Sequence, residues 1–181
     1  MKYLLWLIFA APAGWLLGRY LTDMISYGQF IHGSGQWSVG FLLAALAVTP
    51  LRRLAPRAAW PRFLMRQRRA MGVACFGYAA LHTLVYLERK WGAGLILPEA
   101  REPDLLTGWI ALFIFFLLAA TSNNTSVRVL GRGWKTLHRL VYPGAALTFA
   151  HWLMTTFDPT WALVWLAVLI LMETIRLLRR G

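Results

Sequence analysis

Long apolar runs separated by short polar segments divide the chain into six parts. The runs lie at about residues 3–21, 36–54, 70–88, 106–121, 138–157 and 160–177. Each is close to the ~20 residues with which an α-helix crosses the ~30 Å of bilayer hydrocarbon. The strands of a membrane barrel alternate polar and apolar residues over much shorter lengths. The pattern therefore predicts an all-α, integral membrane bundle of six transmembrane helices.

The polar segments between these runs are short connectors. The longest inner one, about 55–69, is rich in arginine and carries Pro56 and Pro61, and the longest outer one covers about 89–105. Another outer segment, His32-Gly33-Ser34-Gly35, precedes the second run and reads as a loop. With 59% hydrophobic residues and a mean hydropathy of +0.53, the chain is too apolar for a soluble domain. We expect one transmembrane domain over residues 1–181.

The distribution of basic residues predicts the orientation. With both termini in the cytoplasm, fifteen of the nineteen lysines and arginines fall on the inner side, and six of the seven acidic residues fall outside. Cytoplasmic loops of membrane proteins are enriched in basic residues. The net charge of +12 then faces the anionic lipid of the bilayer or a cytosolic partner, and no nucleic acid. The inner set is Lys2, Arg52, Arg53, Arg57, Arg62, Arg66, Arg68, Arg69, Arg128, Arg132, Lys135, Arg139, Arg176, Arg179 and Arg180.

The first residues resemble a signal peptide, because Ala11-Pro12-Ala13 is similar to a cleavage site. We favour a retained first span, because the apolar run continues through Leu17. The single Cys75 excludes an intrachain disulfide and a thiolate metal cluster. The chain also has no phosphate loop and no glycine-rich dinucleotide motif. If it carries out redox chemistry, the soluble donor and the final oxidant are bound elsewhere.

Two histidines lie at the same depth in different predicted spans. His82 is six residues before Glu88 and His151 is seven before Asp158, so both lie about 9–10 Å below the outer edge. Ionisable residues in membrane spans are functional candidates. Two imidazoles at one depth suit the axial positions of a haem, and such a saturated iron favours electron transfer. The alternative is two core histidines bonded to the backbone.

Small residues lie two turns inward of each histidine. Cys75 is seven residues before His82, and Gly144 is seven residues before His151. Positions seven apart share a helix face. Cys75 and Gly144 would leave room for a porphyrin edge.

An inner layer is indicated by His138 and Arg69, each thirteen residues before one of the two histidines. This spacing is about 20 Å along a helix. On an ideal helix His138 would point about 140° away from His151, unless Pro143 kinks the helix. Arg69 suits a haem propionate or a flavin phosphate, or is an anchor at the membrane surface.

Several short motifs occur in an order that is specific as a set. They are His32-x-x-Gly35, Thr49-Pro50-Leu51, Arg68-Arg69, Cys75-Phe76, Leu81-His82, Leu106-Thr107-Gly108, Thr121-Ser122, Leu130-Gly131, Trp134, Leu137-His138-Arg139-Leu140-Val141-Tyr142 and His151. With these motifs the chain resembles the MsrQ (YedZ) family of haem-binding membrane subunits, within the ferric-reductase-like transmembrane superfamily. The resemblance runs from about residue 29 to residue 176.

The resemblance implies a b-type haem in the bacterial inner membrane, with His82 and His151 as the axial ligands of its iron. His138 resembles the third histidine of the family, and Arg69 stands at the fourth position, so that a second haem is in doubt. Electrons would pass from quinol or a cytosolic flavin reductase to a periplasmic molybdopterin-containing (MsrP-like) methionine sulfoxide reductase. Bound FMN is a further option that the resemblance leaves open.

Two alternatives remain from the sequence. The chain could pass electrons to another external oxidant, as ferric reductases do. It could also be a non-redox membrane scaffold or transporter, although inverted repeats and broken helices, which are typical of transporters, are not evident in the sequence.

Overall fold

The computed structural model of the chain describes residues 2–178, and all regular structure in this range is helical. This confirms the predicted all-α class. Arg179 and Arg180, which we assigned to the inner side, lie outside the described residues. The helices are α1 (Lys2–Leu21), α2 (Tyr27–Leu54), α3 (Ala59–Trp91), α4 (Ile96–Glu99), α5 (Pro103–Ala120), α6 (Asn124–Leu130), α7 (Arg132–His138), α8 (Val141–Thr155) and α9 (Thr160–Leu178).

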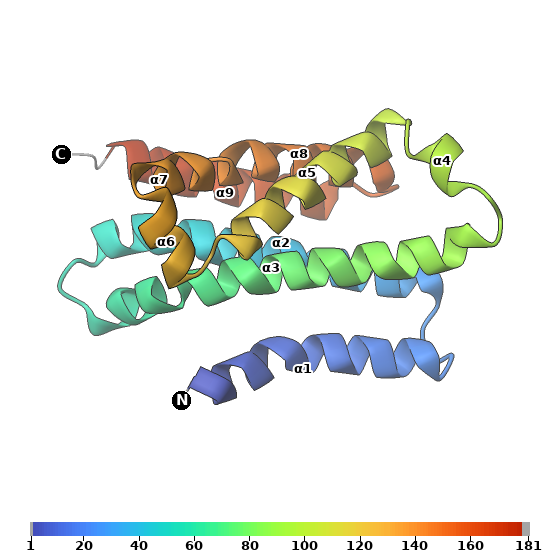
Figure 1. Cartoon of the computed structure of the whole chain (residues 1–181), viewed down its shortest axis with the longest axis horizontal. Helices are drawn as coiled ribbons and strands as arrows, with labels where there is room; N and C mark the ends of the chain where they lie inside the picture. The colour runs from blue at the N-terminus through green and yellow to red at the C-terminus, as the bar shows by residue number, and fades with distance from the viewer. Residues whose placement is uncertain (1, 179–181) are drawn as a thin grey trace.

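Five of these helices are long and apolar enough to cross a membrane, namely α1, α2, α3, α5 and α9. The sixth expected span corresponds to α8, which has 15 residues and is about 22 Å long. This is shorter than the ~30 Å hydrocarbon layer. Both ends of the described chain lie at the same end of the bundle (Figure 1). The six-span topology and the cytoplasmic termini stay predictions.

The second helix begins nine residues earlier than predicted. Ser26 and Gln29 form a capping box, in which the Ser26 hydroxyl accepts from the Gln29 N–H at 3.3 Å and the Gln29 side chain accepts from the Ser26 N–H at 2.8 Å. Such a box satisfies two N–H groups that a helix start leaves unpaired. The predicted loop around His32 is therefore wrong, and His32 is exposed on α2.

The third helix also begins early, at Ala59 instead of residue 70. Pro61 lies in its first turn, where the missing N–H of proline leaves no helix bond unmade. Most of the arginines of the predicted inner connector are thus on α3. In the outer connector, the single turn of α4 is fixed by an ion pair of 2.7 Å between Lys90 and Glu99. The Lys90 ammonium holds the pKa of the Glu99 carboxyl below its ordinary value.

The predicted span 138–157 is broken near its start, which corrects the placement of His138. Helix α7 ends at His138, a turn follows at Arg139 and Leu140, and α8 begins at Val141. Pro143 lies in the first turn of α8 and does not kink a longer helix. His138 and His151 are therefore on different helices, and the helical phase expected between them does not apply.

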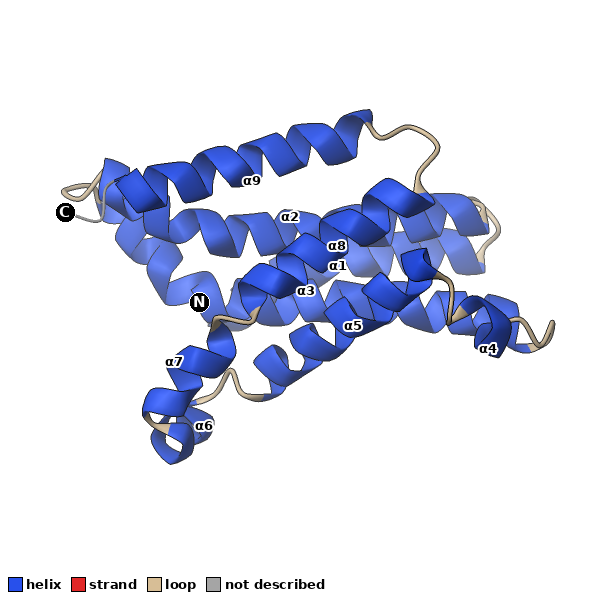
Figure 2. Cartoon of the chain, turned by 90° about the horizontal axis from the view of Figure 1, so that it is seen from above, coloured by secondary structure: helices blue, strands red, loops and turns tan. Residues whose placement is uncertain are grey.

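Two antiparallel helix pairs form the centre of the bundle. One is the hairpin of α2 and α3, and the other is α5 with α8 (Figures 1 and 2). Helix α9 packs on α2, and α1 lies at the edge of the bundle (Figure 1); both are far less buried than α2. The largest core cluster joins both pairs through Leu42, Leu46, Cys75, Ala111, Ile114, Phe115, Leu118 and Ala145.

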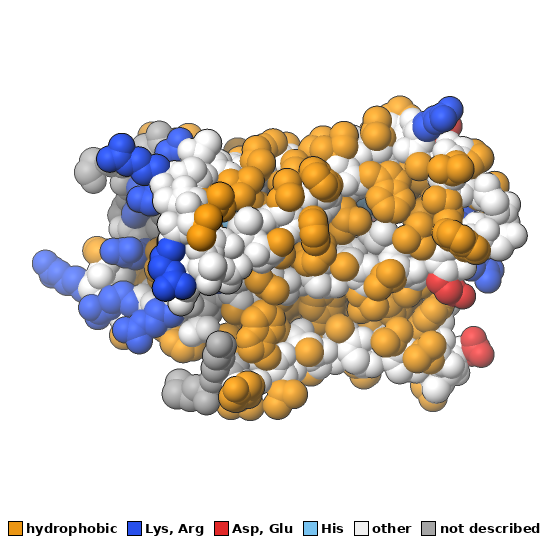
Figure 3. All heavy atoms as spheres, in the orientation of Figure 1, with side chains coloured by type: hydrophobic (Ala, Val, Ile, Leu, Met, Phe, Trp, Pro, Cys, Tyr) orange, Lys and Arg blue, Asp and Glu red, His pale blue; other side chains and the backbone are white. Residues whose placement is uncertain are grey.

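The surface divides into an apolar band and two charged ends. Lysine and arginine side chains gather at the end that carries α6, α7 and both termini, and acidic side chains appear at the opposite end (Figure 3). Large apolar side chains such as Phe113, Ile170 and Leu171 are exposed between these ends. An apolar band between polar ends is expected of a protein that spans a bilayer.

The two small residues below the histidine layer serve helix packing. A Cβ atom on Gly144 would lie 3.0 Å from Phe115 Cε1 and 3.1 Å from Ile114 Cγ2, so this glycine brings α8 close to α5. The Cys75 carbonyl accepts from the Ser38 hydroxyl at 3.0 Å and joins α3 to α2. The Gly144 expectation is wrong, because α5 already fills the space assigned to a porphyrin edge. Small residues permit close backbone approach between membrane helices.

We expect Gly144→Val to separate α5 from α8. Overpacking of a well-packed interface costs roughly 1–3 kcal/mol, which a thermal melt of the protein in detergent would register as a lower midpoint. Gly77→Val on α3 is the matched control, because nothing lies within 4 Å of its Cβ position. Equal midpoints for the two variants would contradict this account of the α5–α8 contact.

Candidate functional site

The structure brings the rings of His82 on α3 and His151 on α8 together, edge toward face, between the two helix pairs. Their ring centroids are 6.4 Å apart and their planes are inclined by 83°. Neighbouring helices thus deliver two imidazoles to one place, although 69 positions separate them in the chain. Both rings lie in the half of the bundle that also carries the acidic end.

Each ring is fixed by one hydrogen bond to a backbone carbonyl. Nδ1 of His82 lies 3.0 Å from the Ile31 carbonyl oxygen on α2, and Nδ1 of His151 lies 2.7 Å from that of Asp104 on α5. The Ser34 hydroxyl, which donates to the Phe30 carbonyl, is a second and longer contact of His82 Nδ1 at 3.3 Å. A carbonyl oxygen only accepts, so both rings carry their proton on Nδ1. Among the described residues no partner is found for either Nε2 atom, so both lone pairs are free for a ligand.

A glycine opens each carbonyl to its histidine. In an α-helix the carbonyl of residue i also accepts the N–H of residue i+4, which here is Gly35 for Ile31 and Gly108 for Asp104. A Cβ atom on Gly108 would lie 2.9 Å from Nδ1 of His151, and one on Gly35 would lie 3.6 Å from Nδ1 of His82. The same carbonyl–glycine arrangement thus occurs in both helix pairs.

The spacing of the two rings fits one metal ion between them. Imidazole nitrogens bind metals at about 2 Å, which places the ring centroids of two opposed ligands about 6 Å apart. The observed 6.4 Å agrees with this value. Metal-ligating histidines commonly donate their other N–H to a carbonyl. The backbone bonds expected for two ordinary core histidines are therefore present. They involve only the Nδ1 atoms and leave both Nε2 atoms available to a ligand.

No group of three or more metal-binding side chains occurs within residues 2–178. A structural zinc ion takes four protein ligands, and a catalytic one takes three. Two histidines alone suit a planar cofactor that brings its own four equatorial nitrogens, as a haem does. The donor set therefore fits a bis-imidazole haem.

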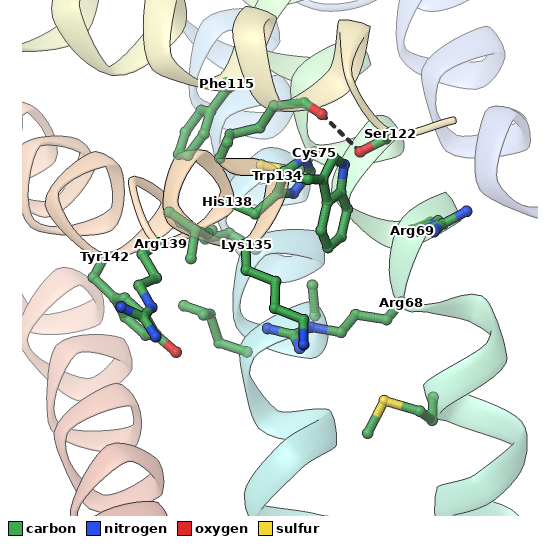
Figure 4. Close-up of a pocket in the computed structure, with 17 residues that line it drawn as sticks. Arg68, Arg69, Cys75, Phe115, Ser122, Trp134, Lys135, His138, Arg139 and Tyr142 are labelled. Atoms are coloured by element: carbon green, nitrogen blue, oxygen red, sulfur yellow. Dashed lines mark hydrogen bonds between the residues drawn. The ribbon is translucent and has the colours of Figure 1, made fainter. Parts of the chain in front are cut away.

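A pocket, called the lower pocket below, lies between His82 and the basic end of the bundle. It encloses about 430 Å³, with apolar walls that include Leu42, Cys75 and Phe115. Arg68, Lys135 and Arg139 line the same pocket, and Figure 4 shows Arg68 and Lys135 reaching toward one side of it. Cys75 is seven residues before His82 on α3, so about 10 Å separates the top of the pocket from the histidine layer.

His138 lines this lower pocket, but its ring is bonded differently from those of the outer pair. Its ring stacks on Trp134 at 3.9 Å between centroids. Its Nε2 lies 3.0 Å from the Thr121 hydroxyl, which donates its own proton to the Leu117 carbonyl at 2.7 Å. Nε2 of His138 is therefore a donor, and its free nitrogen is Nδ1.

Arg69 borders the lower pocket while its charged group turns away from it (Figure 4). Its Nη1 donates to the Asn124 side-chain oxygen at 2.8 Å, and its guanidinium lies 5.5 Å from the centre of the Trp134 ring. The neighbouring Arg68 points into the pocket instead. Sequence reasoning selected Arg69 because of its thirteen-residue spacing, which did not reveal which of two adjacent arginines faces inward.

Comparison with known proteins shows which family the chain is similar to. The family model described as "Ferric reductase like transmembrane component" matches residues 34–149. Relatives from Brucella ovis, Brucella canis and Brucella suis are 37% identical over 163 residues, which covers 85% of this chain and 72% of each relative. Each relative is described as the heme-binding subunit MsrQ of a protein-methionine-sulfoxide reductase. No solved structure matches the chain.

The chain belongs to the MsrQ family, within the ferric-reductase-like transmembrane proteins. This confirms the resemblance inferred from the motifs. The matched region of the family model begins at Ser34, one residue before Gly35, and includes His82, Gly108 and His138. Sequence reasoning did not predict that the Ile31 and Asp104 carbonyls bind the two histidines, or that Gly35 and Gly108 lie beside these bonds. Both glycines are part of the motifs that indicated the family, but the motifs did not reveal their contact with the histidines.

We expect Gly108→Ala to weaken haem binding and Gly35→Ala to leave it near the wild-type level. The added methyl group at Gly108 would force the His151 ring off the Asp104 carbonyl, whereas that at Gly35 only reaches van der Waals contact. Loss of one oriented ligand corresponds to at least about a tenfold rise in the dissociation constant, or 1.4 kcal/mol. Haem titration followed by Soret absorbance measures this ratio, and equal affinities would refute the glycine argument.

Proposed function

We propose that the chain is a membrane cytochrome subunit that passes electrons across the bacterial inner membrane to a periplasmic methionine sulfoxide reductase. One observation carries this proposal, namely the opposed pair His82 and His151, with both Nδ1 atoms bonded to backbone and both Nε2 atoms free. The membrane-spanning helices and the ferric-reductase-like family support an electron-transfer role. The description of the Brucella relatives supports haem and the methionine sulfoxide reductase system.

In this proposal His82 and His151 hold one haem b near the outer end of the bundle. A haem with two imidazole ligands takes up and releases single electrons and has no open position for a substrate. The two backbone carbonyls orient the rings, and the packed helices keep water from the site. The protein therefore supplies position and electrostatics, while substrate chemistry belongs to the partner.

We propose that electrons enter through the lower pocket. Its apolar walls and its three cations, Arg68, Lys135 and Arg139, suit a flat group with an anionic part, such as the phosphate of FMN. His138 and Trp134 would stack against such a group, and Arg69 would contribute charge from the rim. A quinol or a cytosolic flavin reductase would be the donor, since the pocket lies at the basic end, which the positive-inside rule assigns to the cytoplasm.

The partner would be a molybdopterin-containing, MsrP-like reductase at the outer end, which repairs oxidised methionines of periplasmic proteins. His82 and His151, which would hold the haem, lie in the half of the bundle that faces this partner. A second candidate function is electron transfer to another external oxidant, such as ferric iron, which the description of the family model favours. Reduction of the purified partner by the reduced cytochrome, without reduction of ferric chelates, would separate the two.

Replacement of either outer histidine should remove the haem. We expect His82→Ala and His151→Ala to lose the low-spin b-type spectrum, because each variant leaves only one histidine to hold the haem. His32→Ala is the control, since His32 is exposed on α2 and should keep the haem. Pyridine haemochrome quantitation of the detergent-purified proteins gives the haem-to-protein ratio. A wild-type protein that takes up no haem, even when it is supplied, would overturn the cytochrome assignment.

The lower pocket should set the affinity for the electron donor. We expect the double variant Arg68→Ala, Lys135→Ala to bind reduced FMN or quinol at least about tenfold more weakly, because hydrogen bonds to charged groups contribute about 1.5–3 kcal/mol each. The haem content should not change. Stopped-flow reduction of the haem, with dithionite as a donor that needs no pocket, measures the effect. Arg128→Ala on α6 is the control, and the same slowing in it would argue against a specific entry site.

A further inference from the structure

A second hollow, which shares Arg69 and Ser122 with the rim of the lower pocket, lies between α1 and the rest of the bundle. It encloses about 790 Å³ near the basic end. Leu4 and Ile8 of α1 line one side, and Phe63, Ala70 and Val73 of α3 line the other. In Figure 1, α1 runs along the edge of the bundle with its N-terminus at the basic end. The hollow is therefore bounded by apolar side chains that a membrane protein turns toward lipid.

Two arginines are placed on the same hollow. Arg66 and Arg69 lie three residues apart on α3, so they share a helix face. Gln67 and the side chains of Asn123 and Asn124, which precede and begin α6, complete the polar part of the lining. The bond from Arg69 to Asn124, which lines this hollow, holds its guanidinium on this side. The polar part thus presents a prepositioned guanidinium and amide groups.

The positive charge of this polar part is not compensated by the protein. Within residues 2–178 the ion pairs are Lys90 with Glu99 and Arg176 with Glu173. Neither involves Arg66 or Arg69. Arginine is well suited to bind phosphate, because its planar group donates two parallel hydrogen bonds. The hollow therefore combines an anion-binding part with apolar walls.

The vertical order of these groups matches an amphipathic ligand. Arg66 is sixteen residues before His82 on the continuous helix α3, so it lies about 24 Å from the histidine layer. Val73 lies seven residues further along α3 toward the histidine layer, so it is about 10 Å deeper in the bilayer than Arg66. The charged part is thus at the level where headgroups meet water, and the apolar walls continue from it into the hydrocarbon layer.

We propose that this hollow binds an anionic phospholipid, with its phosphate on Arg66 and Arg69 and an acyl chain between α1 and α3. Basic pockets between transmembrane helices are known to accept anionic headgroups. A quinone has a neutral headgroup and would leave both guanidinium groups without a counter-ion. The bound lipid would fill the space between α1 and the bundle and would stabilise the protein by its binding free energy.

Native mass spectrometry of the detergent-purified full chain tests the proposal, with titrations of phosphatidylglycerol and phosphatidylcholine. The wild-type protein should bind one phosphatidylglycerol at least about tenfold more tightly than phosphatidylcholine. Arg66→Gln should lose this preference. Ala70→Trp, which fills the apolar part and keeps both arginines, should lose the bound lipid. Arg62→Gln is the matched control, because Arg62 is one turn earlier on α3 and does not line the hollow.

Three results would overturn the proposal. Equal binding of both lipids by the wild-type protein would mean that the hollow holds only bulk bilayer lipid. Equal loss of preference in Arg66→Gln and Arg62→Gln would indicate attraction by the basic surface as a whole. A stoichiometric quinone in the solvent extract, absent from Ala70→Trp, would assign the hollow to quinone. Each readout is a lipid or quinone content, so it does not depend on haem or on electron transfer.

Discussion

The hydrogen bond from each Nδ1 atom to a backbone carbonyl is the constraint on which the outer site depends. It selects the tautomer, fixes the ring plane and leaves Nε2 as the only free nitrogen. The bond also joins the two helices of each pair, α2 to α3 and α5 to α8. The 6.4 Å between the rings therefore follows from the packing of the two pairs. A ligand that bridges both Nε2 atoms would hold the pairs together in turn.

The outer layer around His82 and His151 and the inner layer around His138 differ in the ligands that they can hold. The outer layer has two free imidazole nitrogens, and the described backbone satisfies the remaining ring nitrogens. The inner layer has one histidine, bonded to Thr121, and several cations without carboxylate partners. The free imidazole nitrogens are thus in the outer layer, and the cations suited to an anionic group are in the inner one. This asymmetry agrees with entry of electrons through a negatively charged donor and exit through a ligated metal.

Much of the fold could be predicted from apolar run length alone. The runs 3–21, 106–121 and 160–177 correspond closely to α1, α5 and α9. The errors occur where a local device extends or breaks a helix beyond its apolar run. The capping box at Ser26 begins α2 in polar sequence, Pro61 is tolerated in the first turn of α3, and the turn at Arg139 separates α7 from α8. Hydropathy does not detect these devices, because each depends on a few polar atoms.

The two histidine side chains of the candidate site could be selected from the sequence, but the backbone carbonyls that bind them could not. Equal depth in two apolar runs was enough to select His82 and His151, because few ionisable residues occur there. The partners at the shortest distances are backbone carbonyls, which every residue carries, so residue type marks only Ser34, whose hydroxyl lies 3.3 Å from Nδ1 of His82. The signal is the glycine four residues later, Gly35 after Ile31 and Gly108 after Asp104. At Gly108 the close approach requires glycine, because a Cβ atom there would lie 2.9 Å from Nδ1 of His151, whereas Gly35 leaves room for a methyl group. A glycine on the helix that faces an intramembrane histidine thus indicates which carbonyl receives its proton.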